Sequence, residues 1–112
     1  YYNKNQMADK YQILNELKSI LTDKPGANLK EVILFGSQAN GGAHANSDYD
    51  FLIILEKIPH WELKRQISDY CYDLDLKYDT FLDVHILGKE ELNTLRRKQP
   101  IFQTALEKGI RA

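Results

Sequence analysis

The chain contains a single cysteine, Cys71, so it has no internal disulfide. Without such a cross-link, a domain of 112 residues depends on its hydrophobic core for stability. A chain of this length buries roughly two-thirds of the surface that its unfolded form exposes, which is enough to form such a core. Cys71 lies among apolar and aromatic residues of a predicted helix. That setting indicates a buried, reduced thiol, and a cytoplasmic location fits it.

Long hydrophobic runs and an excess of positive charge are also lacking. No apolar stretch approaches the roughly 20 residues that a membrane helix needs, and we expect no signal peptide and no membrane association. The 15 basic and 16 acidic residues are interspersed, so binding to extended nucleic acid is not expected. No histidine pair has zinc-ligand spacing.

What the sequence does contain is the pattern of one globular domain, which we expect to span residues 1–112. Residues 1–6 are polar and aperiodic, and we expect them to be an extension or a cloning remnant outside the fold. The predicted elements follow in order: helix 9–22, strand 32–35, a short helix capped by Ser37, strand 49–55, a helix from Pro59 through Leu74, strand 80–87, a helical segment 89–97 and a helix from Pro100 to Gly109. This order predicts an α/β (α+β) fold, a small mixed β-sheet backed by helices.

The segment after the first predicted strand is suited to a phosphate. Gly36 permits a tight turn and a close approach of backbone to ligand. Ser37 then begins a predicted helix, whose free N–H groups and positive dipole end favour an anion. However, no lysine follows in the Walker arrangement, so a P-loop phosphotransferase is a poor alternative.

Two acids stand at the head of the second predicted strand. Asp48 and Asp50 are separated by Tyr49, so both carboxylates project to one face while Tyr49 points into the core. Neighbouring carboxylates repel each other unless a cation neutralises them. Mg²⁺ suits this role, because it binds carboxylates together with substrate phosphates.

A third acid, Asp83, lies in the next predicted strand. Leu82, Val84 and Ile86 alternate with it and are expected on the opposite, apolar face. If the two strands are neighbours, Asp83 approaches the pair, and two Mg²⁺ ions can stabilise an in-line displacement at phosphorus. Asp83 is then also the candidate to accept the proton of the attacking hydroxyl. An edge strand with a solvent-facing Asp is the alternative.

Other candidates have simpler interpretations. Asp73 and Asp75 share the spacing of the acid pair, but they lie in a predicted helix and are interpreted as solvated surface. Asp79 is the reserve candidate for the third carboxylate, but it is interpreted as a turn residue before the strand. His85 shares the face of Asp83 and is expected to be a half-exposed strand residue, although a place beside the site remains open.

The pattern Gly36-Ser37, ten residues, then Asp48-Tyr49-Asp50 resembles the signature of the DNA polymerase β-like nucleotidyltransferase superfamily. It is most similar to the minimal nucleotidyltransferases (MNT proteins), which often accompany HEPN-domain partners. The segments VILFGS, FLIIL, LDVHIL and the final EKGI fit that family in order and spacing, so the resemblance covers the chain from about Ala8.

The resemblance implies that Gly36 and Ser37 hold the triphosphate, that Asp48 and Asp50 bind metal ions, and that the third carboxylate maps onto Asp83. It implies ATP as substrate, two Mg²⁺ ions as cofactors and a HEPN-type protein as partner. Many relatives carry arginines where this chain has Gln38 and Asn40, which lowers the positive charge near the triphosphate.

Two functional hypotheses therefore remain. The first is a metal-dependent nucleotidyltransferase that moves AMP from ATP to an acceptor hydroxyl, for example on a partner protein as an MNT-type antitoxin. The second is a non-catalytic antitoxin module that keeps the fold and acts by binding alone. A chain of 112 residues has little room for a second substrate domain, so a partner or a second copy in a homo-oligomer is expected to complete the acceptor site.

Overall fold

The computed structural model describes residues 9–36, 39, 48–93 and 99–112. Within these ranges the regular elements follow closely the order expected from the sequence. They are α1 (Lys10–Thr22), β1 (Leu29–Phe35), β2 (Tyr49–Leu55), α2 (Trp61–Tyr78), β3 (Leu82–Gly88), the 3₁₀ helix η2 (Lys89–Asn93), α3 (Pro100–Lys108) and β4 (Ile110–Arg111). The short helix predicted at Ser37 lies outside the described residues, as do residues 94–97 of the predicted helical segment.

The four strands form one mixed sheet in the order β3-β2-β1-β4. β1 pairs antiparallel with both β2 and β4, whereas β2 and β3 are parallel. The small mixed sheet backed by helices is thus confirmed. β4 was not predicted, because its two residues follow Gly109 and are too few to produce a periodic pattern.

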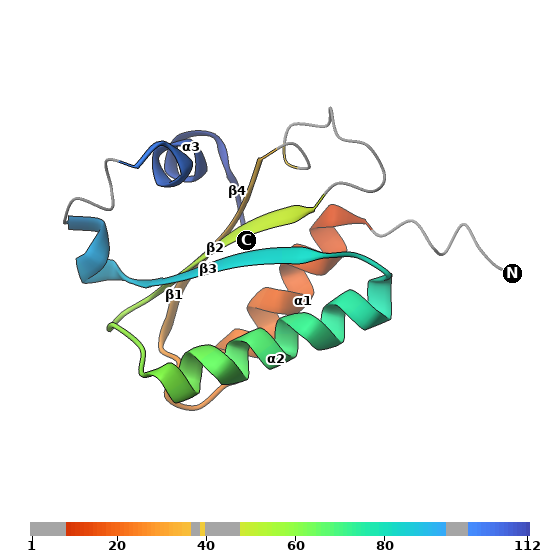
Figure 1. Cartoon of the computed structure of the whole chain (residues 1–112), viewed down its shortest axis with the longest axis horizontal. Coiled ribbons are helices and arrows are strands. Elements are labelled where there is room, and N and C mark those ends of the chain that lie inside the picture. The colour runs from red at the N-terminus through yellow and green to blue at the C-terminus, as the bar shows by residue number, and fades with distance from the viewer. Residues whose placement is uncertain (1–8, 37–38, 40–47, 94–98) are drawn as a thin grey trace, which may run out of the picture.

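Helices cover both faces of the sheet, α1 and α2 on one and α3 on the other (Figure 1). Alternate residues of the central strands therefore enter different cores. Phe51, Ile53 and Leu55 of β2 pack with α1 and α2, while Leu52 and Ile54 pack with α3. All five are at most 1% exposed, which explains why β2 is apolar at every position after Asp50.

Capping residues define the ends of the helices on the first face. The side chain of Asp9 accepts a hydrogen bond from the Tyr11 amide and caps α1. α2 begins at Trp61, two residues after Pro59, and ends at Asp79, which has the left-handed conformation (φ 52°). Asp79 is therefore a helix-ending turn residue, as predicted. None of the helices that the structure describes has the long apolar stretch that crossing a membrane requires.

The two acids of α2 differ, and the prediction that both are solvated surface is wrong for one of them. Asp73 is exposed, but Asp75 is partly buried, and its Oδ1 accepts a hydrogen bond of 2.7 Å from the backbone N–H of Leu82. Asp75 thereby connects α2 to the first residue of β3, directly before Asp83. Helical spacing could not reveal this contact, because it depends on how α2 packs beside β3.

Cys71 lies on the inner side of α2 and is buried, as predicted. Burial raises the pKa of its thiol to about 12, and the charge of Asp75 acts in the same direction. At neutral pH the side chain is therefore a protonated, unreactive part of the core.

Replacing Asp75 with Ala should destabilise the fold by about 1–3 kcal/mol, because the partly buried amide of Leu82 loses its acceptor. Asp73→Ala, on the exposed side of the same helix, should change the free energy of unfolding by less than about 0.5 kcal/mol. Urea unfolding of both variants at low protein concentration measures the difference. Equal effects of the two substitutions would contradict a structural role for the Asp75 contact.

Candidate active site

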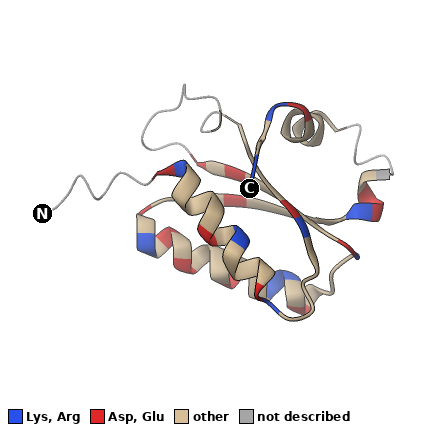
Figure 2. Cartoon of the chain, turned by 180° about the vertical axis from the view of Figure 1, so that it is seen from behind, with Lys and Arg blue, Asp and Glu red and all other residues tan. Residues whose placement is uncertain are grey.

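Two acids meet across the parallel pair of strands. Asp50 of β2 and Asp83 of β3 are register partners, and both side chains project to the face of the sheet that α3 covers. Figure 2 shows acidic segments side by side near the starts of these strands. β3 therefore adjoins β2, which was the condition for Asp83 to approach the acid pair. β3 is also an edge strand of the described sheet, and the Asp83 side chain is half exposed, as the alternative expected.

The glycine turn after β1 lies directly against one of these acids. Gly36 has φ +79°, a conformation that side chains other than glycine rarely adopt. A Cβ atom at this position would collide with the Asp50 carboxylate. The turn expected to face phosphate and the acid expected to face a cation are thus in contact, because Phe35 of β1 pairs with Asp50 of β2.

The electrostatic surroundings of Asp50 disfavour its charge. Burial raises the pKa of Asp50 above the usual carboxyl range, and the charges of Asp83 and Asp48 raise this pKa further. A hydrogen bond with Asp83 acts in the same direction, and His85 partly opposes these effects. A group in this position holds its proton more firmly than an isolated Asp until a cation approaches.

Asp48 and Tyr49 occupy the start of β2. Asp48 immediately precedes the strand and is exposed, near enough to Asp50 to influence its charge. Tyr49 is buried in the core on the opposite face, as the alternation of strand side chains predicted. Ser37 lies outside the described residues, so its expected contact with phosphate remains a prediction.

His85 lies beside the acids on the same face. Its ring packs between the rings of Phe35 and Phe102, with centroid distances of 6.1 Å and 5.8 Å. Its Nε2 atom lies 3.9 Å from Oδ2 of Asp83, beyond hydrogen-bond length, and has no hydrogen-bond partner among the described residues. His85 thus lies beside Asp83 and packs against two phenylalanine rings, so it has the place beside the acids that the sequence left open.

Lys10 is a contact that the sequence analysis missed. Its Nζ atom donates a hydrogen bond of 3.3 Å to the carbonyl of Ala39, in the segment that follows the glycine turn. The first turn of α1 is therefore tied to this segment, and it brings a positive charge toward a region that lacks the arginines of many relatives. No local signal could have identified Lys10, since 29 residues separate the two partners.

The donor chemistry of the acids suits a hard divalent cation, although the described residues alone do not form a group of three ligands that could hold one. Mg²⁺ usually takes only one or two carboxylates and completes its shell with water and substrate phosphates. Asp50 and Asp83 provide two such carboxylates beside the turn. The arrangement therefore fits an ion that arrives with a triphosphate better than a permanently bound one.

The described residues thus bring two carboxylates together beside a glycine turn on one face of a mixed sheet. Residues 5–106 match the family described as "Polymerase beta, Nucleotidyltransferase". The chain belongs to this nucleotidyltransferase family.

Two proteins of Methanocaldococcus jannaschii are similar in sequence. MJ0141, named as an inferred protein adenylyltransferase, is 36% identical over 74 residues, which are 66% of this chain and 71% of that protein. MJ0604, named in the same way, is 30% identical over 96 residues, which are 86% of this chain and 90% of that protein. Both matches include most of each relative's length.

Solved structures share the fold at lower sequence identity. A mutant of the toxin–antitoxin MntA–HepT superimposes with a TM-score of 0.61 at 19% identity, covering 87% of this chain and 69% of that chain. A toxin–antitoxin structure with AMP-PNP gives 0.56 at 20% identity, covering 98% and 72%. A tri-AMPylated HEPN toxin of Shewanella oneidensis in complex with an MNT antitoxin gives 0.56 at 17% identity, covering 92% and 71%.

Gly36→Ala and Gly26→Ala form a matched pair of substitutions. Both glycines have positive φ, +79° and +83°, but an added Cβ meets the Asp50 carboxylate only at Gly36 and nothing within 4 Å at Gly26. Each variant should lose about 1–2 kcal/mol of stability from the backbone conformation. Gly36→Ala should lose more, because Asp50 must also move. Urea unfolding compares them, and equal losses would contradict the contact between Gly36 and Asp50.

Asp50→Asn should stabilise the protein at pH 7 in the absence of divalent cations. A folded-state pKa above the unfolded value of about 3.9 means that the native state loses stability as Asp50 ionises. The stability difference between variant and wild type should therefore shrink as the pH falls toward about 4. Urea unfolding in EDTA across this range tests it, with Asp73→Asn as control. A variant less stable than wild type at pH 7 would contradict the repulsion.

Proposed function

We propose that this chain is a Mg²⁺-dependent nucleotidyltransferase that moves AMP from ATP to a hydroxyl group of an acceptor. The observation that carries the proposal is the pairing of Asp50 with Asp83 directly against the Gly36 turn, in a chain of the nucleotidyltransferase family. An unliganded protein gains nothing from neighbouring acids whose charges repel. The arrangement is explained if a cation shared with a nucleotide neutralises them.

Each residue of the proposed site has a distinct role. Gly36 and Ser37 hold the triphosphate through backbone N–H groups and the serine hydroxyl. Asp48, Asp50 and Asp83 hold two Mg²⁺ ions, which, when bound, offset the negative charge of the phosphates and of the displaced pyrophosphate. Asp50 contacts the Gly36 turn, and the pairing of β2 with β3 holds Asp83 opposite Asp50.

The reaction is an in-line displacement at the α-phosphorus of ATP. The acceptor oxygen forms a new bond to phosphorus, the bond to the β-phosphate bridging oxygen breaks, and pyrophosphate leaves. Asp83 accepts the proton of the acceptor hydroxyl. Its place on the edge strand supports this role, because β3 has no neighbouring strand on its outer side in the described sheet, and an acceptor can approach from there.

The acceptor that we favour is a hydroxyl side chain of a HEPN-type toxin, which would make this chain an MNT antitoxin. Two observations on similar proteins support this choice. The M. jannaschii relatives are named as inferred protein adenylyltransferases. The Shewanella structure pairs an MNT antitoxin with an AMPylated HEPN toxin, and another neighbour contains AMP-PNP. A protein acceptor also suits a small domain, because the partner can provide the acceptor side of the site.

Incubation with α-labelled ATP, Mg²⁺ and a HEPN-type protein encoded beside this chain tests the proposal. Label should pass to the HEPN protein and require Mg²⁺, and Asp50→Asn or Asp83→Asn should each reduce transfer by at least about 100-fold. Asp79→Asn should leave transfer unchanged, because Asp79 only ends α2 and Asn tolerates its left-handed conformation.

The same experiment separates the enzyme from the second hypothesis, a partner-binding antitoxin without catalysis. Inhibition of the HEPN protein without label transfer, unaffected by Asp50→Asn, would overturn the enzymatic proposal and support binding alone. Loss of both inhibition and transfer in Asp50→Asn, with normal binding of the HEPN protein, would support the enzyme.

A further inference from the structure

The outer side of α2 carries large apolar side chains that are mostly exposed in the described chain. Trp61 is 69% exposed, Tyr72 61% and Leu76 66%. These exposures place Trp61 and Tyr72 outside the core. The buried residues Ile67, Cys71 and Leu74 occupy the opposite side of the helix.

These exposed residues share one face, here called the α2 outer face and defined by Trp61, Arg65, Ser68, Asp69, Tyr72 and Leu76. Their spacing of three, four, seven or eight residues places them in a single stripe along the helix. An exposed helix face of this kind, aromatic with a few charges, is typical of a protein–protein interface.

The face is complementary to itself when turned end for end. Trp61 and Leu76 lie at equal distances from the midpoint between Ser68 and Asp69, and so do Arg65 and Tyr72. An antiparallel copy would therefore set indole against leucine and guanidinium against phenol, each contact occurring twice. Ser68, a small residue, lies at the midpoint, where two helices approach most closely.

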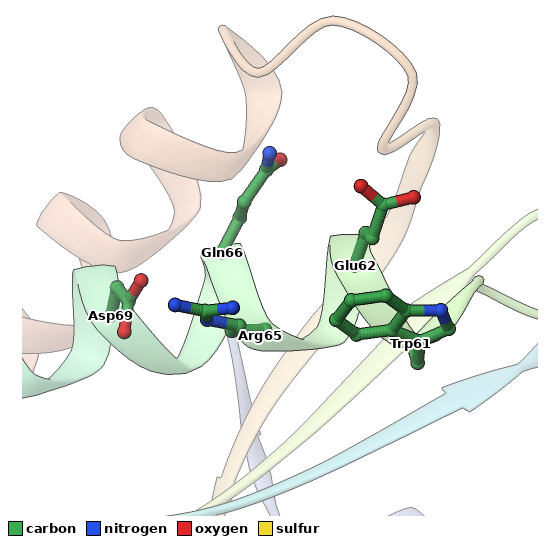
Figure 3. Close-up of a pocket in the computed structure, with 5 residues that line it drawn as sticks. All are labelled: Trp61, Glu62, Arg65, Gln66 and Asp69. Atoms are coloured by element: carbon green, nitrogen blue, oxygen red, sulfur yellow. The ribbon is translucent and has the colours of Figure 1, made fainter.

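The charges and the shape of the face agree with this arrangement. A hollow of about 260 Å³ is lined by Trp61, Glu62, Arg65, Gln66 and Asp69 (Figure 3). Tyr72 of an antiparallel copy would lie over this hollow. Near the midpoint the Asp69 carboxylates of both copies would meet, each flanked by Arg65 guanidinium groups, so opposite charges surround them.

We propose that the α2 outer face binds the same face of a second copy of this chain, with the two helices antiparallel about a twofold axis between Ser68 and Asp69. This inference does not rest on the proposed chemistry. Asp50 and Asp83 project from the other face of the sheet, which α3 covers, so a dimer through α2 does not involve the acids themselves.

Sedimentation equilibrium across the micromolar range tests the pairing. The wild-type chain should be a dimer, and Trp61→Ala or Tyr72→Ala should weaken self-association by at least about thirtyfold, the effect of truncating a central interface residue. Both side chains are exposed in one copy, so the variants should fold normally by circular dichroism. Tyr11→Ala, which removes an exposed aromatic from α1, should leave the dimer unchanged.

A charge exchange tests the antiparallel register. Arg65→Asp sets four carboxylates around the axis, and Asp69→Arg sets four guanidinium groups there, so each variant alone should associate at least about tenfold more weakly than wild type. Mixing the two variants restores opposite charges, and the mixture should form a dimer. A mixture that associates no better than its components would overturn the proposal.

Cross-linking provides a direct measure of the axis. Ser68→Cys should form an intermolecular disulfide under mild oxidation, while the wild-type chain should not, because its Cys71 is buried. A wild-type chain that stays monomeric, combined with a loss of HEPN-protein binding in Trp61→Ala, would assign the face to a different partner and overturn self-association. Label transfer by a monomeric chain would overturn the dimer and leave the enzymatic proposal intact.

Discussion

The parallel pairing of β2 with β3 is the constraint on which the site depends. It sets Asp50 opposite Asp83, while the antiparallel pairing of β1 with β2 brings Gly36 onto the same carboxylate. Burial, together with the repulsion from Asp83 and Asp48, raises the pKa of Asp50 and opposes folding at neutral pH in the absence of a cation. The sheet can sustain this cost because almost every other position of β2 is buried and apolar.

The helix α2 serves the site from a distance. Its inner side packs on the sheet through Ile67, Cys71 and Leu74, and its Asp75 binds the amide of Leu82, the residue before Asp83. The start of β3 is therefore held by α2 as well as by β2. On the opposite end of the site, Lys10 of α1 binds the carbonyl of Ala39. Both helices of one layer thus bind backbone groups next to the site, at Leu82 before Asp83 and at Ala39 after the Gly36 turn.

The sheet separates the acids of the candidate active site from the exposed side of α2. Asp50, Asp83 and His85 lie on the side of the sheet that α3 covers, whereas the exposed Trp61 and Tyr72 lie on α2. A contact made by α2 leaves the acids accessible, and a nucleotide bound at the acids leaves α2 accessible.

The sequence by itself determined the order of the helices and of the three long strands, because these depend on local periodicity, although β1 begins at Leu29 rather than at residue 32. The alternation around Tyr49 and the glycine turn before it were enough to predict where Asp50 and Gly36 lie. Only the tertiary structure decided which strands are neighbours and that β4 completes the sheet. It also decided that Asp75 accepts a hydrogen bond from the Leu82 amide of β3 and that Lys10 donates one to the Ala39 carbonyl. These features join residues far apart in the chain, and their formation depends on packing of whole elements rather than on neighbouring residues.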